Sequence, residues 1–366
     1  MNHQKMALDP RGSADDVRVS REDLQGYVRE IFSATGCGER EAGLIAEHLV
    51  LANLLGHDSH GVSLIKLYVR MVREGKINLD QRVSQVMDAG TLLTLDASRG
   101  FGQALGHEAM QIGIERARQQ GSVILALRNS HHLARIGHWA EMCAEAGLVS
   151  IHFVNVLHAV PTVAPYAGSD ARLNTNPFAI GVPRADKPPM ILDFATSRVA
   201  QGKMRIAMNR GVQAPEGYLL DASGQPSVDP SVVYRSPLGA LLPFGEHKGA
   251  GLGFMCDMLA GALSGAGTLH EGHMEQDVYI NNMLSIIIDP QRLGGMENWC
   301  SEVEAGAAYV KASPPREGMG PVLVPGELEQ SVAQQRRVHG IPVDRETWQS
   351  ILDAAQQVGV GLPSFV

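Results

Sequence analysis

Cysteine is scarce in this chain, and the few cysteines form no recognisable pattern. Cys37, Cys143, Cys256 and Cys300 lie far apart among 366 residues, and none stands in a Cys-x-x-Cys spacing. That spacing is typical of zinc knuckles and redox dithiols, so the sequence predicts neither kind of site. Two disulfides could still form, but a chain of this length can build a core without them, which favours a reducing compartment, the cytoplasm.

Long apolar runs and clusters of like charge are also missing. The longest apolar stretch, residues 250–266, is broken by Asp257 and by glycines, and it is too short to cross a bilayer. Residues 1–20 mix charges of both signs without an apolar run, which predicts a flexible tail instead of a secretory signal. The 31 Lys and Arg against 39 Asp and Glu give a net charge of −8. This charge disfavours nucleic acid and anionic membranes as partners.

The chain further lacks the G-x-G-x-x-G fingerprint of a dinucleotide-binding Rossmann domain. The Gly-Phe-Gly at 100–102 is followed by Leu105 where the third glycine belongs, and the Gly-Ala-Gly at 249–251 by Phe254. A Rossmann domain is therefore disfavoured. Residues 248–251 could still cradle a pyrophosphate, because a helix N-terminus offers free N–H groups and partial positive charge. The same glycines could equally serve close helix packing, and the residues alone leave both possibilities open.

What is present is a globular composition whose texture changes along the chain. Hydrophobic residues make up 44% and charged residues 19% of the sequence, enough for a large core. The length favours two or three domains in one continuous fold. Residues 21–85 show helical periodicity, residues 86–320 alternate strands with helices, and the C-terminal segment 321–366 returns to helix from about Ile341. We expect an α/β region over 86–320 that binds cofactor and substrate, with the two helical ends packed together.

The patterns also predict individual elements. Ser20, three residues before Asp23, and later Asp344 are the predicted N-caps. The expected helices cover about 21–35, 39–55, 64–74, 102–119, 136–146 and 248–263, and the expected strands 91–96, 123–127, 148–156, 178–182, 190–194 and 283–288, with a hairpin at 217–230.

Three short clusters join imidazole to a turn or a helix start. They are residues 57–60 (His-Asp-Ser-His), 130–132 (Ser-His-His) and 246–249 (Glu-His-Lys-Gly). Side chains at such places can project into a cleft while backbone N–H groups remain free. Histidine titrates near neutrality, so it can pass a proton while a hydride moves to or from carbon. Any one cluster taken alone is better explained as a helix cap or a loop hydrogen bond.

The same histidines permit a metal site. His57 and His60 have the His-x-x-His spacing, and His131 and His132 follow later in the chain. The carboxylate of the HExxH arrangement is missing, however, and no cysteine stands near as a further ligand. A metal-dependent hydrolase is thus an alternative from another class, and we expect no metal.

Six motifs stand in order along the chain. They are Gly56-His57-Asp58-Ser59-His60-Gly61, Asn129-Ser130-His131-His132, Thr175-Asn176-Pro177, Leu192-Asp193-Phe194-Ala195-Thr196-Ser197, Gly245-Glu246-His247-Lys248-Gly249 and Val324-Pro325-Gly326-Glu327. Together they resemble the type 2 malate/L-lactate dehydrogenases, a family that includes sulfolactate, ureidoglycolate and hydroxycarboxylate dehydrogenases and piperideine-2-carboxylate reductases. The resemblance runs from about Val19 to the C-terminus. It is nearest to the hydroxycarboxylate dehydrogenases, which share Arg135-Ile136-Gly137 and Lys311-Ala312-Ser313-Pro314.

The resemblance implies a non-Rossmann NAD(P)-binding α/β fold and a homodimer. His132 matches the proton acceptor and donor of the family, while Ser59 and His60 match a pair that supports proton transfer and touches the nicotinamide. Thr175 matches a substrate-side position. The implied cofactor contacts are His60, Ala134, Arg135, Ile136, Ile191, Leu192, Asp193, Phe194, Ala195, His247, Lys248, Asn281, Gly326, Glu327, Leu328 and Glu329. Main-chain groups at a strand end and two basic side chains suit a ribose and a pyrophosphate.

One departure from the family bears on the substrate. Many members carry an arginine four residues after the histidine of the Ser-His pair, where its guanidinium can grip the substrate carboxylate, whereas this chain has Leu64. If Leu64 lies on the substrate side, a bulkier or more apolar 2-keto acid is expected and malate is disfavoured. In the alternative, Leu64 faces the core in a helical series with Leu67, Tyr68 and Met71.

The sequence therefore predicts an NAD(P)-dependent 2-hydroxycarboxylate dehydrogenase, or 2-keto acid reductase, with His132 as acid/base. Its small-molecule partner would be a 2-keto or 2-hydroxy acid. NAD is the expected cofactor and NADP is possible, because the acidic residue that decides this in Rossmann domains has no counterpart here. The alternative with the same fold is reduction of a cyclic imine such as piperideine-2-carboxylate. An imine carbon beside a carboxylate needs the same two transfers.

Overall fold

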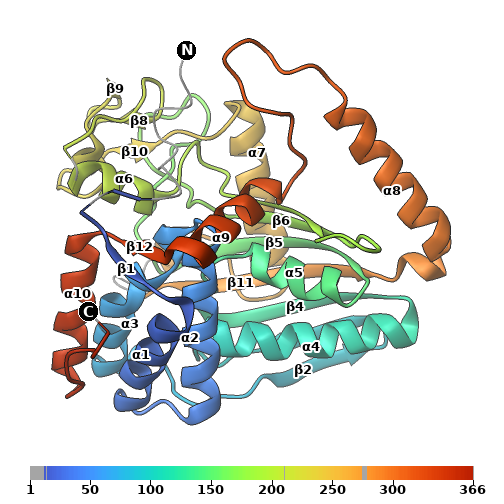
Figure 1. Cartoon of the computed structure of the whole chain (residues 1–366), viewed down its shortest axis with the longest axis horizontal. Helices are drawn as coiled ribbons and strands as arrows, with labels where there is room; N and C mark the ends of the chain where they lie inside the picture. Colours follow the sequence, from blue (N-terminus) through green and yellow to red (C-terminus); the bar gives the residue numbers. More distant parts are fainter. Residues whose placement is uncertain (1–11, 14, 210, 274–277, 366) are drawn as a thin grey trace.

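The centre of the molecule is a seven-stranded mixed sheet (Figure 1). The computed structural model describes residues 12–13, 15–209, 211–273 and 278–365. In spatial order the strands are β2 (Ser84–Ala89), β3 (Leu92–Asp96), β4 (Ser122–His131), β11 (Ile280–Ile288), β5 (Val149–Leu157), β6 (Phe178–Val182) and β7 (Met190–Phe194). Only β3 and β4 run parallel, so the sheet is unlike the parallel Rossmann sheet. The predicted non-Rossmann α/β fold is confirmed.

One face of this sheet is covered by α4 (Gly102–Gln120) and α5 (Gly137–Glu145). The two helices pack fully buried side chains such as Leu105 and Trp139 against Val123, Leu125 and Ile287 of the sheet. Their apolar residues recur at helical spacing, which is why both helices were predictable. This layer is the main core of the α/β region.

The opposite face carries an unbroken row of aliphatic side chains. The strand registers place Leu92, Ile124, Ile286, Ile151, Ile180 and Leu192 side by side across six strands. We call these six residues the aliphatic row. Leu92 is 44% exposed, Ile124 38% and Leu192 36%, and the other three are half-buried. Helix α7 (His247–Cys256) and the π-helical segment Asp257–Ala262 cover this face only in part. The π-helical segment packs mainly on β5 and β11.

The two ends of the chain form a helical layer together (Figure 1). Its elements are β1 (Val17–Val19), α1 (Arg21–Ala34), α2 (Glu39–Leu54), α3 (Ile65–Arg73), α9 (Glu327–His339), β12 (Ile341–Val343) and α10 (Arg345–Gln357). Leu24, Leu49 and Tyr68 from the N-terminal helices share one core with Trp348 and Ile351 of α10. The predicted packing of the two helical ends is therefore confirmed.

Helices α1 and α10 of this layer have the N-caps that the sequence predicts. The side chain of Ser20 accepts a hydrogen bond from the backbone N–H of Asp23, and that of Asp344 accepts one from Thr347. The segment 1–20 differs from the flexible tail expected, because its last residues form β1, which pairs antiparallel with β12. Residues 1–11 and 14 lie outside the described residues.

A smaller unit follows β7 and stands over the helical layer (Figure 1). It consists of a three-stranded sheet in the order β10 (Ala240–Leu241), β8 (Leu219–Leu220) and β9 (Pro226–Ser227), together with α6 (Gln201–Asn209). We call it the α6 lobe. Its own core is small and includes Val163, Met204, Leu219 and Leu241. The hairpin predicted at 217–230 is confirmed by β8 and β9, whereas α6 was not predicted.

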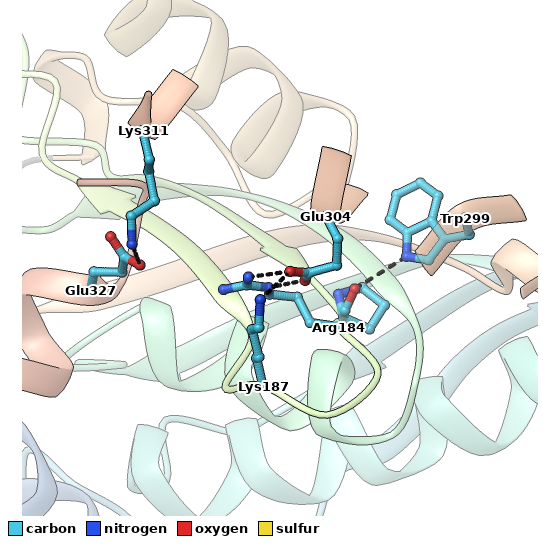
Figure 2. Close-up of polar contacts among 7 residues, drawn as sticks. Arg184, Lys187, Trp299, Glu304, Lys311 and Glu327 are labelled. Atoms are coloured by element: carbon cyan, nitrogen blue, oxygen red, sulfur yellow. Dashed lines mark hydrogen bonds and ion pairs between the residues drawn. The ribbon is translucent and has the colours of Figure 1, made fainter. Parts of the chain in front are cut away.

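Helix α8 (Met296–Lys311), also not predicted, projects from the body as an arm. Ala307 is its only buried residue, and Tyr309 is 84% exposed. Figure 2 shows how polar contacts attach it to the turn between β6 and β7. Both Arg184 and Lys187 reach the carboxylate of Glu304, at 2.5 and 2.6 Å, and the Trp299 indole donates to the carbonyl of Pro183.

Short helical turns complete the described chain. They are the 3₁₀ helices Asp58–His60, Val62–Leu64, Pro230–Val233, Glu271–His273 and Pro290–Arg292. Among the described helices, none combines the length and the apolar character that crossing a membrane would require.

Candidate active site

A cavity of about 1260 Å³ lies where the helical layer, the sheet and the α6 lobe meet. His57–His60 and His132 line it from one side, and Ser197–Lys203 and Tyr234 from the α6 lobe. Small-molecule sites commonly measure roughly 300–1,000 Å³. The cavity therefore has room for a ligand much larger than a small acid.

The Gly56–Gly61 motif forms one wall because its backbone is tightly held. The Asp58 carboxylate receives both terminal nitrogens of Arg336 from α9, at 2.6 and 3.0 Å, and the amide of Asn53 at 2.7 Å. A Cβ on Gly61 would lie 1.9 Å from the Asn53 Oδ1, so only glycine fits there. The aspartate of the motif lines the cavity but has a structural role, which leaves Ser59 and His60 beside it for contacts with a ligand.

The two predicted imidazoles meet at this wall. The rings of His60 and His132 are nearly parallel, at 28°, with centroids 6.1 Å apart. Ser59 Oγ lies 3.1 Å from His60 Nδ1, so the predicted Ser-His pair is in contact. The other side of His132 meets Tyr68, whose hydroxyl oxygen lies 2.7 Å from the Nδ1 of His132.

Both imidazoles are held in the neutral form. Burial, then the charges of His57 and Lys203, lowers the pKa of His60 to about 4. Burial, then the neighbouring His60 and His131, lowers the pKa of His132 to about 3. A neutral imidazole has a free ring nitrogen, so either residue can accept a proton from a ligand at neutral pH.

The α6 lobe brings cations to the same cavity. Within the part of the chain that the structure describes, the Lys203 ammonium forms no ion pair or hydrogen bond, and the Arg198 guanidinium donates only to the Pro243 carbonyl. A Cβ on Gly202 would lie 2.7 Å from the Cβ of Ser59, so the first turn of α6 packs directly on the Ser-His pair. The cavity therefore combines neutral imidazoles with unpaired cations, a combination that suits an anionic ligand.

Six of the predicted cofactor residues besides His60 line the cavity. They are Ala134, Arg135, Ile136, Asp193, Phe194 and Ala195. The backbone N–H of Gly137 donates to the Asp193 carboxylate at 2.8 Å, which joins the start of α5 to the end of β7. Burial raises the pKa of Asp193. The guanidinium of Arg135 pairs with Glu141, and its backbone N–H donates to the Nε2 of His48, so both the charge and the N–H of this residue are already engaged.

The remaining predicted cofactor residues do not line the cavity. Glu329 lies beside the cavity, because its carboxylate lies 3.7 Å from the cavity residue His57. Gly326, Glu327 and Leu328 precede it at the start of α9, next to β7, where the Ile191 N–H donates to Pro325. Leu192 belongs to the aliphatic row.

Asn281, His247 and Lys248 are the other three. Asn281 is buried, and its side chain accepts from the Leu133 N–H and donates to the Asn155 carbonyl, so it supports the backbone that follows His132. His247 and Lys248 are exposed at the start of α7.

Comparison with known proteins identifies the family to which the chain belongs. The pattern of the malate/L-lactate dehydrogenases matches residues 19–352. The chain belongs to this family. It is 47% identical over 345 residues to hydroxycarboxylate dehydrogenase B of Escherichia coli strain K12, covering 94% of this chain and 95% of that protein.

Other members of the malate/L-lactate dehydrogenase family show its breadth. The chain is 33% identical over 340 residues to a Δ1-pyrroline-2-carboxylate/Δ1-piperideine-2-carboxylate reductase of Pseudomonas putida, covering 92% and 96% of the two chains. Its fold superimposes with a TM-score of 0.91 on a solved structure described as a putative malate/lactate dehydrogenase from E. coli, at 46% identity over 94% and 96% of the chains.

The substrate-side residues of this malate/L-lactate dehydrogenase family member can now be placed. Thr175 lines the cavity, and its carbonyl accepts from the N–H and the hydroxyl of Thr196. Leu64 lines the cavity as well, while the same half-buried side chain packs at the edge of the helical core. Leu64 therefore fits both interpretations given by the sequence, because it faces the cavity and also packs on the core.

Two kinds of residue were missed by the sequence analysis. Tyr68 was assigned only to a helical series, and Arg198 and Lys203 were not singled out. The available signal was that Arg198 directly follows the motif that ends at Ser197 and that Lys203 comes five residues later. As for metals, no three His, Cys, Asp or Glu side chains come together as a ligand cluster within the described residues.

Proposed function

We propose that this chain is a nicotinamide-dependent 2-hydroxycarboxylate dehydrogenase that acts as a 2-keto acid reductase. The observation that carries the proposal is the pairing of two neutral imidazoles, His60 and His132, with the unpaired cations Arg198 and Lys203 around one cavity. A 2-keto acid needs both features, because it presents a carboxylate to be bound and a carbonyl oxygen to be protonated. In oxidation the free ring nitrogen of His132 would take the proton of the hydroxyl group, and in reduction the same nitrogen, after taking up a proton from water, would give it to the carbonyl oxygen.

The residues present fit a dinucleotide. The cavity exceeds the needs of a small acid, and the backbone of 134–136 and the strand end 193–195 open onto it. Gly137 has no room for a Cβ, which would lie 2.8 Å from an oxygen of Asp193, so the chain approaches closely there. When bound, a nicotinamide supplies or accepts the hydride. We take NAD as the preferred form because the motifs are nearest to the hydroxycarboxylate dehydrogenases.

The cations on the α6 lobe also separate this proposal from the imine alternative. A cyclic imine beside a carboxylate is reduced most readily as its protonated, cationic form, and the Lys203 ammonium would repel that cation. A ketone carries no such charge. The free Lys203 therefore favours a keto acid, and we propose that Lys203 with Arg198 replaces the arginine that is absent at Leu64.

The proposal is tested with a substrate panel. Pyruvate, phenylpyruvate, 2-oxoglutarate and Δ1-piperideine-2-carboxylate would each be assayed with NADH and with NADPH, in the presence and absence of EDTA. We expect chelator-independent oxidation of NADH with one or more 2-keto acids and little with the imine. Activity with the imine alone would instead establish the alternative, and activity with no member of the panel would overturn the proposal.

We also propose that the protein is a homodimer whose partner copy covers the aliphatic row. The row crosses five strand spacings, roughly 24 Å, and Phe254, Met255 and Leu263 extend the exposed apolar surface along α7 and just beyond the π-helical segment. A twofold axis sets a surface against itself, so an uncharged apolar row matches its own copy without like-charge conflict. Because all four cysteines are free thiols, we place this dimer in the reducing cytoplasm.

The dimer is tested by light scattering. Ile124→Lys and Leu92→Lys change side chains that are already exposed in one chain, so they should fold and give the mass of a single chain. Val338→Lys, at a 74% exposed position on α9, is the matched control and should leave the mass at two chains. A variant of the row that keeps the wild-type mass would contradict this interface.

A further inference from the structure

The rear side of His132 is closed by a short hydrogen-bonded chain. Tyr68 of α3 is fully buried, and its hydroxyl lies 2.7 Å from the Nδ1 of His132. Gln103 of α4 is 1% exposed, and its amide nitrogen lies 3.2 Å from the same hydroxyl. Burial raises the pKa of Tyr68, so the phenol stays neutral. Three groups from three elements thus meet behind the cavity.

Glycine at position 102 makes this meeting possible. A Cβ there would lie 2.4 Å from the carbonyl oxygen of His132 and 2.6 Å from that of His131. Helix α4 therefore begins directly against the backbone that carries His132, and the next residue, Gln103, is brought within reach of Tyr68. The same amide nitrogen also lies 3.4 Å from the His132 carbonyl.

The neighbouring His131 shows that this arrangement is specific. His131 is fully buried beside the rings of Tyr68 and Phe101, yet neither of its ring nitrogens has a hydrogen-bond partner among the described residues. His132, one residue later, has its Nδ1 paired. Within the described residues, the Tyr68 oxygen therefore pairs with the imidazole of His132 and not with that of His131.

We propose that Tyr68 is a positioning residue that fixes the tautomer of His132, with Gln103 holding Tyr68 in place. The inference rests on the proposed function. For Nε2 to take a proton from a substrate it must lack hydrogen, and then Nδ1 carries the single N–H of the neutral ring. That buried N–H needs an acceptor, and the Tyr68 oxygen is the one within reach among the described residues.

The same oxygen stabilises the charged state. Once Nε2 is protonated, Nδ1–H still donates to Tyr68, and a hydrogen bond to a charged group is stronger than one between neutral groups. Tyr68 thus offsets part of the burial that disfavours the imidazolium. Without it, the ring would lose its orientation and the pKa of His132 would fall further below the ordinary value.

The test is Tyr68→Phe, which removes only the hydroxyl. We expect kcat to fall about 10- to 100-fold, the loss of one buried, charge-assisted hydrogen bond, with KM nearly unchanged. The limb of the oxidation pH profile that reports His132 should move to lower pH. Gln103→Leu should change kcat in the same direction by a smaller factor, because the Tyr68 hydroxyl remains. Tyr27→Phe is the matched control and should change neither quantity, since Tyr27 is a buried tyrosine of the same core that donates to Gly361.

A second readout needs no substrate. In ¹⁵N NMR of histidine-labelled protein, we expect the neutral His132 ring to carry its hydrogen on Nδ1 in the wild type and to shift toward the Nε2–H form in Tyr68→Phe. An unchanged tautomer, or an unchanged kcat despite a changed tautomer, would overturn the positioning role. Failure of the proposed function can be distinguished from failure of this positioning role, because it would appear as full activity in the His132→Ala variant.

Discussion

The two sides of the cavity are built in different ways. The side with His60, Tyr68 and His132 belongs to the large helical core and the sheet, and its polar groups are buried and hydrogen-bonded. The side with Arg198 and Lys203 belongs to the α6 lobe, which has a small core, and these two cations have no carboxylate partner within the described residues. A rigid side suits proton transfer, which needs fixed geometry, and an unpaired cation suits capture of a charged ligand. Changes on the first side should therefore lower turnover, and changes on the second should weaken substrate capture.

The largest effect is expected for His132→Ala. A positioned acid/base contributes roughly 10²–10⁴ in rate, so kcat should fall by that factor while binding of the reduced cofactor, followed by its fluorescence, stays near the wild-type value. His339→Ala, at an exposed position on α9, is the control. Near wild-type turnover in the His132 variant would contradict the assignment of proton transfer to this side of the cavity.

A smaller loss, confined to substrate capture, is expected for Lys203→Met. A hydrogen bond to a charged group contributes about 1.5–3 kcal/mol, so kcat/KM for a 2-keto acid should fall roughly 10- to 150-fold. The loss should be much smaller for the uncharged methyl ester of the same acid, and Lys203→Arg should recover part of the activity. Equal losses for acid and ester would show that Lys203 does not bind the carboxylate.

Leu64→Arg adds a cation to the side with His60, Tyr68 and His132. Because Leu64 lines the cavity, the guanidinium can meet the second carboxylate of oxaloacetate, and the ratio of kcat/KM for oxaloacetate over phenylpyruvate should rise about tenfold. Thermal unfolding must be measured alongside, since Leu64 also packs on the helical core. A stable variant with an unaltered ratio would contradict a substrate-side role for position 64, and an unfolded one would show that packing dominates there.

The smallest effect concerns stability and pH at His131. Burial lowers its pKa from 6.5 to about 3, so between these values the unfolded chain binds a proton that the folded chain does not. The free energy of unfolding should then decrease as pH falls below about 6.5, by roughly 1.4 kcal/mol per pH unit for this group. His131→Phe should make that slope shallower in urea unfolding and change little at neutral pH. An identical slope in the variant would mean that His131 is not held neutral.

The fold was predictable wherever a face is clearly apolar. The helices of the N-terminal layer and α4 were found because their buried residues recur at helical spacing. Strands β4 and β11 extend beyond the expected 123–127 and 283–288, because their ends are paired through polar residues, where Asn282 accepts from the backbone of Asn129. Helix α8 escaped prediction although Trp299, Val303 and Ala307 recur at helical spacing, since Ala307 is the one residue that it buries.

The site was predictable as a set of motifs but not as an arrangement. His60, His132, Thr175 and the end of β7 do line one cavity, as a shared function would require. Tyr68 and Lys203 could not be singled out, because each occupies an ordinary position in a helix and acquires its role only through a partner distant in sequence. The predicted helix 248–263 changes to a π-helical segment at Asp257, whose buried carboxylate binds the amide of Asn155, and no local pattern announces such a contact.

The attachment of α8 has a consequence for ionic strength. Arg184 and Lys187 lower the pKa of Glu304 to about 2, so this carboxylate stays ionised and the arm is held mainly by charge (Figure 2). Dissolved salt screens the exposed Lys187–Glu304 pair over roughly 10 Å at 0.1 M, screens the pair of the 9% exposed Arg184 less, and leaves a buried core unaffected. The arm is therefore the part of the molecule whose amide hydrogens exchange faster as salt is added. Because Lys311 also pairs with Glu327 at the start of α9, that loosening reaches the chain segment that runs beside β7.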